Sequence, residues 1–128
     1  VEMVDFYRTL GELCGLEVPG TVSGVSLAAA LRDPKTNIRT SALTQYSNGY
    51  SLRTERFRYT EWGKDGAGGA ELYDRAKDPG EMVNLAGSVE MKATQSELSK
   101  VLRQRVAAAQ EKPKSLVQIR FSNRRRVR

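Results

Sequence analysis

The sequence predicts an α+β fold in which an antiparallel sheet of about four strands packs against a helix near the C-terminus. Between residues 40 and 74, four short segments are rich in aromatic and β-branched residues and are separated by turn-forming residues. After residue 88, apolar residues recur at the spacing of a helix. The length of 128 residues suits a single hydrophobic core.

A helix is predicted at the start of the chain, over residues 1–14. Apolar residues recur there every three or four positions, and this spacing gathers them on one face that we expect to be buried. That face consists of Met3, Phe6, Tyr7, Leu10, Leu13 and Cys14. Gly15 stands where a left-handed residue commonly ends a helix, and Leu16 follows as its apolar contact. Because neither an initiator Met nor an N-cap residue precedes Val1, we expect the natural protein to start upstream.

Residues 17–40 are predicted to form an irregular connection that contains at most one or two helical turns, at 25–31. Strands are predicted at 41–46, 50–53, 57–62 and 71–74, with a flexible loop at 63–69. Asn48-Gly49 is expected to form a hairpin turn, because both residues tolerate positive φ. Phe57, Tyr59 and Glu61 alternate with polar neighbours, which is typical of a strand with one wet face.

The aromatic residues and arginines of the predicted strands can be interpreted either as structural residues or as ligand-binding residues. The aromatic residues are interpreted as core and cross-strand packing rather than as a platform for sugars; they are Tyr50, Phe57, Tyr59 and Trp62. The arginines are interpreted as a solvated strand face, with contact to an anionic glycan as the alternative; they are Arg53, Arg56 and Arg58.

The second half of the chain is predicted to be helical. Asp78 is expected to cap a short helix, with Pro79 in its first turn and Glu81 closing a capping box. A longer helix is predicted from about residue 88 to residue 110, ended by Pro113. Its apolar stripe consists of Leu98, Val101, Leu102 and Val106.

The net charge of +6 is unevenly distributed. Of the 21 lysines and arginines, seven lie in residues 112–128, which contain no acidic residue. Residues 1–111 therefore carry 14 basic and 15 acidic side chains, a net charge of −1. This distribution argues against a nucleic-acid-binding fold, whose positive charge usually lies on a structured face. No apolar run approaches the roughly 20 residues that span a bilayer.

Four ordered motifs resemble the C-terminal region of sulfatases. Residues 1–16, which contain Val4-Asp5 and Leu13-Cys14-Gly15-Leu16, resemble the sulfatase helix V-D-x-x-P-T-L-x-x-L-A-G-L, with Arg8 in place of Pro. Gly24-Val25-Ser26-Leu27 resembles the G-x-S-L connection that follows it. Gly49-Tyr50-Ser51-Leu52-Arg53-Thr54 and Arg58-Tyr59-Thr60-Glu61-Trp62 resemble the hairpin of iduronate-2-sulfatase-like enzymes. Glu71-Leu72-Tyr73-Asp74 and Asp78-Pro79-x-Glu81-x-x-Asn84-Leu85 resemble the common sulfatase ending.

This resemblance implies an enzyme of the alkaline-phosphatase-like superfamily that hydrolyses sulfuric esters of sulfated sugars or polysaccharide outside the cytoplasm, with calcium and formylglycine in the parent protein. Residues 1–38 would end its catalytic α/β domain, residues 39–111 would form the C-terminal subdomain, and residues 112–128 would be a basic tail. The partners implied are the catalytic domain of the same protein and, through it, a sulfated glycan; neither nucleic acid nor a membrane is expected. Gln45 and Tyr46 are candidates for the rim of the substrate cleft, although Ser47-Asn48 replaces the Pro-Arg of the iduronate type.

The sequence contains no candidate catalytic or metal-binding residues. Formylglycine is made in the pattern C/S-x-P-x-R, but Leu16 and Val18 follow Cys14, and no serine fits the pattern. Histidine, the commonest general base and metal ligand, is absent. Cys14, the only cysteine, is interpreted as a small buried apolar side chain rather than a nucleophile.

Two hypotheses therefore remain. The first is a sulfatase C-terminal region that supports the catalytic domain and borders the substrate cleft, with an exposed apolar patch around Phe6, Leu10 and Leu13 when it stands alone. The second is a small polyanion-binding module that acts through its basic tail. The tail residues proposed for that role are Arg120, Arg124, Arg125, Arg126 and Arg128.

Overall fold

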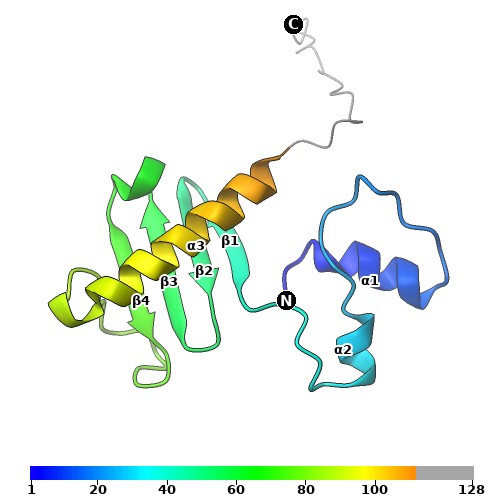
Figure 1. Ribbon diagram of the computed structural model, residues 1–128, viewed down its shortest axis with the longest axis horizontal. Helices are drawn as coiled ribbons and strands as arrows, with labels where there is room; N and C mark the ends of the chain where they lie inside the picture. The colour runs from blue at the N-terminus through cyan, green and yellow to red at the C-terminus, as the bar shows by residue number, and fades with distance from the viewer. Residues whose placement is uncertain (112–128) are drawn as a thin grey trace, which may run out of the picture.

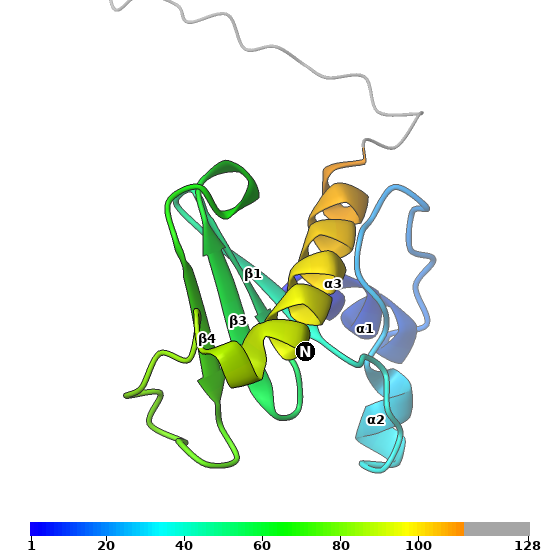
Figure 2. The same cartoon turned by 60° about the vertical axis from the view of Figure 1, so that its left-hand side comes forward.

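The structure of the protein, a computed structural model, describes residues 1–111 (Figure 1). Two short helices, α1 (Asp5–Leu13) and α2 (Ala28–Arg32), lie beside a four-stranded antiparallel sheet. The strands are β1 (Ala42–Tyr46), β2 (Gly49–Arg53), β3 (Phe57–Trp62) and β4 (Ala70–Asp74), in the order β1-β2-β3-β4. Helix α3 (Lys92–Gln110) crosses one face of the sheet (Figure 2). This arrangement confirms the predicted fold class.

The strands lie within one or two residues of their predicted positions, but the first hairpin turn differs. Tyr46 pairs with Gly49, so Ser47 and Asn48 form the turn, and Ser47 rather than Asn48 has the positive φ of 53°. Gly49 already belongs to β2, and its lack of a Cβ has another cause. A Cβ there would come within 2.5 Å of Cε3 of Trp62, because the indole lies directly over this glycine.

The core lies between the sheet and α3. Leu52, Tyr59 and Leu72 point to the same face of the three adjacent strands β2, β3 and β4, because their positions are directly paired in the sheet. Leu98 and Leu102 of α3 pack on them, and all five side chains are buried. The predicted apolar stripe of the helix is therefore confirmed, with Val101 and Val106 packed at its border.

Helix α1 differs from its prediction in both length and orientation. It begins at Asp5, and its apolar side chains are exposed, as Tyr7 (58%) and Leu10 (60%) illustrate. The expected burial of this face is therefore wrong for the chain alone. The buried side is polar: the hydroxyl of Thr9 donates to the carbonyl of Asp5 at 2.7 Å and accepts the N–H of Leu27 at 2.9 Å.

Cys14 follows α1 and is exposed, so its predicted burial is also wrong. The predicted helix end is confirmed. Gly15 has a φ of 66° and donates its N–H to Glu12 O at 3.2 Å, and Leu16 donates to Gly11 O at 2.8 Å. This pair of hydrogen bonds closes the last turn of the helix.

The predicted capped helix at residues 78–81 is wrong. These residues form a turn in which Glu81 has a φ of 56°, and the Asp78 carboxylate accepts the N–H of Val83 at 2.8 Å. A short 3-10 helix, Val89–Met91, precedes α3 instead. The physical reason is that the Glu81 carboxylate pairs with Arg58 and Arg75, while the N–H of Asp78, which a capping box would use, donates to Asp74 O at 2.8 Å.

Ion pairs that are buried or partly buried join the two-helix part to the sheet and α3. Asp5 is fully buried and ion-pairs with Arg39, and Glu2 ion-pairs with Arg105 of α3. Glu2 also accepts the N–H of Leu43 on β1 at 2.9 Å. Burial raises the pKa of Asp5, but hydrogen bonds from Arg39 and from two backbone N–H groups outweigh it and lower the pKa to about 2. Within residues 1–111, no helix is long and apolar enough to cross a membrane.

Candidate functional site

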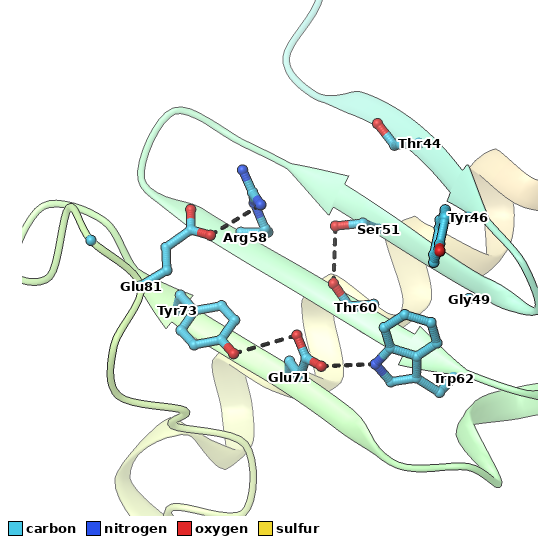
Figure 3. Close-up of a pocket in the computed structure, with 11 residues that line it drawn as sticks. Thr44, Tyr46, Gly49, Ser51, Arg58, Thr60, Trp62, Glu71, Tyr73 and Glu81 are labelled. Atoms are coloured by element: carbon cyan, nitrogen blue, oxygen red, sulfur yellow. Dashed lines mark hydrogen bonds and ion pairs between the residues drawn. The ribbon is translucent and has the colours of Figure 1, made fainter.

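The face of the sheet opposite α3 carries no helix among the described residues (Figure 2). The strand register arranges its side chains in three cross-strand rows. The rows are Tyr46, Gly49 and Trp62; then Thr44, Ser51, Thr60 and Glu71; then Arg53, Arg58 and Tyr73. We call this surface the open face. A hollow of about 380 Å³ lies over most of this face and is also lined by Glu81, whereas Arg53 lies outside its lining (Figure 3).

A carboxylate fixes two aromatic side chains of the open face. The indole Nε1 of Trp62 donates to Glu71 Oε1 at 2.9 Å, and the Tyr73 hydroxyl donates to Glu71 Oε2 at 3.4 Å (Figure 3). Burial raises the pKa of Tyr73, as does the adjacent Glu71 charge, so the phenol remains a donor. Trp62 is half-buried against Gly49, whereas Tyr46 beside it is 76% exposed. The aromatic row thus presents one fixed ring and one free ring.

The opposite end of the open face is basic. Arg53 and Arg58 are directly paired across β2 and β3, which brings two positive charges to the same face. Arg58 Nη1 lies 3.0 Å from Glu81 Oε2. Arg75 Nε lies 2.8 Å from Glu81 Oε1, but its N–H does not point at that oxygen, so this contact is an ion pair without a hydrogen bond. Glu81 holds this position at a φ of 56°, a conformation that costs a non-glycine residue about 1–3 kcal/mol.

The two predicted rim residues lie on opposite faces of the sheet. Tyr46 belongs to the open face, while Gln45 shares the other face with Tyr50 and donates its side-chain amide to Ser47 O at 3.4 Å. Adjacent residues of a strand must point to opposite sides. The structure therefore does not bring Gln45 and Tyr46 together in one site.

The aromatic residues divide between the two faces. Tyr59 is buried, and Tyr50 and Phe57 pack against the core, as the sequence predicts. Trp62 instead lies on the open face. Trp62 lies two and four positions after Thr60 and Arg58 in β3, so all three side chains point to the same face. This alternation is the sequence signal that predicts Trp62 on the open face.

Other charged groups of the sheet serve the fold. Arg56 donates to both carboxylate oxygens of Asp74, at 3.0 and 2.6 Å, and lies over the ring of Phe57. On the α3 side, burial raises the pKa of Glu61, but hydrogen bonds from Ser99, Arg103 and Tyr59 outweigh it and lower the pKa. Glu61 is thereby an ionised anchor for α3.

The described residues do not fit the metal and nucleophile that the resemblance implies. Within residues 1–111, no group of three or more Asp, Glu or Cys side chains could hold a metal ion. Calcium and formylglycine therefore remain expectations for the parent protein. The arginines of the basic tail lie beyond residue 111, outside the described residues.

Comparisons with known proteins agree on one family. Residues 1–108 match the family described as N-sulphoglucosamine sulphohydrolase, C-terminal. A Δ4,5-hexuronate-2-O-sulfatase of Bacteroides thetaiotaomicron is 36% identical over 92 residues, which cover 65% of this chain and 19% of that protein. A sulfatase of Formosa agariphila is 33% identical over 94 residues, covering 73% of this chain and 18% of that protein.

Solved structures show the same likeness. A protein solved in complex with its substrate, D-glucosamine-2-N,6-O-disulfate, superposes with a TM-score of 0.70 at 28% identity, covering 80% of this chain and 23% of that one. The chain therefore spans about a fifth of the length of the curated relatives it matches.

Proposed function

This chain belongs to the family of N-sulphoglucosamine sulphohydrolase C-terminal domains, and we propose that it is the C-terminal region of a sulfatase that supports the catalytic domain and borders the substrate cleft. In this role it contributes no catalytic group. The parent enzyme hydrolyses sulfuric esters of sulfated sugars, with calcium and formylglycine supplied by its catalytic domain. It works outside the cytoplasm.

The exposed apolar face of α1 carries this proposal. A helix that exposes large apolar side chains along its length and at both of its ends marks an interaction surface. The exposed residues are Met3, Phe6, Tyr7, Leu10, Leu13 and Leu16. Its polar side is occupied internally, since Asp5 and Thr9 bind the connection to the sheet. The apolar side is thus free to dock on the catalytic domain, and the predicted patch around Phe6, Leu10 and Leu13 is exposed in this structure.

The substrate class is proposed from the relatives. One matched relative is a hexuronate-2-O-sulfatase, and a matched structure holds a glucosamine disulfate. Both names describe sulfated sugars, and we extend that class to the parent of this chain. The hairpin motif favours an iduronate-2-sulfatase-like enzyme within this class.

The proposal is tested by the coding sequence that precedes Val1. We expect a C/S-x-P-x-R motif there, and its absence would overturn the assignment of the parent as an active sulfatase. The chain alone should release no sulfate from an aryl sulfate at any calcium concentration, because it lacks the required residues. A measured turnover by the chain alone would contradict the supporting role.

Docking is tested separately with the catalytic region of the parent. Adding the chain to that region should form a complex by analytical ultracentrifugation, and Leu10→Glu should abolish it by placing a charge in the apolar face. Lys100→Gln, a change at an exposed side chain of α3, is the control. Complex formation by Leu10→Glu as tight as by the unchanged chain would show that α1 is not the docking surface.

A second candidate function rests on the charge distribution. All the excess positive charge belongs to residues 112–128, so the tail could retain the protein on a polyanion with an affinity that falls steeply as salt rises. Replacing Arg124, Arg125 and Arg126 with glutamine should lower the salt concentration that elutes the chain from heparin. Unchanged elution would exclude this role.

A further inference from the structure

The open face combines features that protein stability alone does not explain. Like charges placed directly opposite each other across two strands are destabilising, yet Arg53 and Arg58 form such a pair. Among the described residues, Glu81 pairs with Arg58, and no carboxylate pairs with Arg53. A pair of guanidinium groups in this arrangement is stabilised by an anion that contacts both.

The other end of the open face suits an uncharged part of the same ligand. Trp62 lies flat over Gly49 and is held by Glu71, so its ring is fixed before any ligand arrives. Tyr46 is exposed beside it. Rigid aromatic rings present a large apolar area at a low cost in conformational entropy, and the C–H faces of pyranose rings pack on such surfaces.

Between these ends lies a row of polar groups. Thr60 donates its hydroxyl to Ser51 at 3.0 Å, which orients both side chains, and the Glu71 carboxylate accepts from Trp62 and Tyr73 (Figure 3). Hydroxyl and carboxylate groups of this kind bind sugar hydroxyls. Four residue steps separate the aromatic row from the arginine row, or roughly 14 Å along the strands, a length that suits a short oligosaccharide.

We infer that the open face is a binding site for a sulfated oligosaccharide, in which a pyranose ring packs on Trp62 and Tyr46 while a sulfate or carboxylate group bridges Arg53 and Arg58. This inference rests on the proposed function and adds a site to it. Charge complementarity favours the glycan as the occupant, because Arg53, Arg58 and Arg75 outnumber the single carboxylate of Glu81 at this end of the open face. Glu81 is a positioning residue that orients Arg58.

The test uses Trp62, the only tryptophan of the chain, as a local reporter. Intrinsic fluorescence of the full 128-residue chain is titrated with a trisulfated heparin disaccharide and, in parallel, with its unsulfated counterpart. We expect a saturable change with the sulfated disaccharide and binding at least tenfold weaker without sulfate. No change in Trp62 emission at millimolar disaccharide would overturn the inference.

Single substitutions measure the contribution of each proposed contact to disaccharide binding. Arg53→Gln and Arg58→Gln should each weaken binding about tenfold, as expected for the loss of a charge-assisted hydrogen bond. Tyr46→Ala should weaken it without affecting folding, because this ring is exposed. Arg32→Gln, a change on α2 and outside the open face, should leave the fluorescence titration unchanged. Equal binding by the Arg53, Arg58 and Tyr46 variants, with unchanged circular dichroism, would overturn the inference.

A further experiment distinguishes this inference from the proposed function. When the catalytic region of the parent docks, the disaccharide titration of Trp62 should persist. Loss of that titration on docking would show that the catalytic region covers the open face, which overturns the sugar site and leaves the supporting role intact. A preserved titration in the absence of any docking would support the site while contradicting the supporting role.

Discussion

Helices α1 and α3 are both amphipathic, but they use their two sides in opposite ways. The apolar stripe of α3 is buried on the sheet through Leu98 and Leu102, while the apolar stripe of α1 is exposed and its polar side is buried through Asp5 and Thr9. The same spacing of apolar residues thus forms part of the core in α3 and an exposed apolar surface in α1. Periodicity identifies which face is apolar but does not identify what covers it.

The largest expected effect separates these two stripes directly. Leu102→Ala should lower the free energy of unfolding by about 2–5 kcal/mol, because it removes a buried side chain from the core. Leu10→Ala, the matched change on α1, should alter it by less than about 0.5 kcal/mol. Urea denaturation followed by circular dichroism measures both, and equal losses would mean that the α1 stripe is buried in solution.

A smaller effect is expected on the polar side of α1. Asp5→Asn should destabilise the chain by about 1–3 kcal/mol, because it weakens a charge-assisted hydrogen bond in a buried site. Arg39 limits the loss, since it also lies 3.5 Å from the Glu2 carboxylate. Thr9→Val is a useful companion change, and no loss from either variant would indicate that α1 is not held by its polar side.

The same carboxylate predicts a pH dependence. The pKa of Asp5 is lowered from 3.8 to about 2 in the folded chain, so the folded state favours the ionised form. Its stabilising contribution is complete above pH 4 and is lost as the pH falls from about 4 to about 2. Unfolding measured across this range should show a steeper loss for the unchanged chain than for Asp5→Asn. Parallel pH profiles would contradict the lowered pKa.

The smallest expected effect concerns Cys14, which follows the last turn of α1 and is exposed. Its thiol should react with a disulfide reagent within about threefold of the rate in the denatured chain, because exposure governs access to a thiol. Docking of the catalytic region should slow the reaction by covering this side of α1. Fast reaction only after denaturation would show that the thiol is buried.

The elements that short-range patterns decide are those that the sequence predicts. The strands were predictable because aromatic and β-branched residues mark them and turn residues separate them, as in β3 from Phe57 to Trp62. The stripe of α3 was predictable because its covering sheet lies in the same chain. The predicted burial of the apolar face of α1 is wrong for this chain, because the sequence does not show which surface would cover that face.

The candidate site was less accessible from the sequence. The spacing of Glu81 from Asp78 predicts a capping box, but Glu81 pairs with Arg58, which lies 23 positions earlier in the sequence. A pair between residues so far apart decides whether residues 78–81 form a capped helix or a turn, and the local sequence is compatible with both. The residue type of Trp62 predicts a place in the core, whereas the strand alternation puts it on the open face with Arg58.

The junction of Glu2, Asp5, Arg39 and Arg105 has a consequence for how this region can be exchanged between proteins. A chimaera that joined a foreign catalytic domain to residues 39–111 would retain Arg39 and Arg105 but lose both of their carboxylate partners. It would also lose the Glu2 acceptor for the N–H of Leu43 at the edge of the sheet. A segment that keeps these contacts when it is moved to another protein must therefore include Glu2 and α1 as well as the sheet and α3.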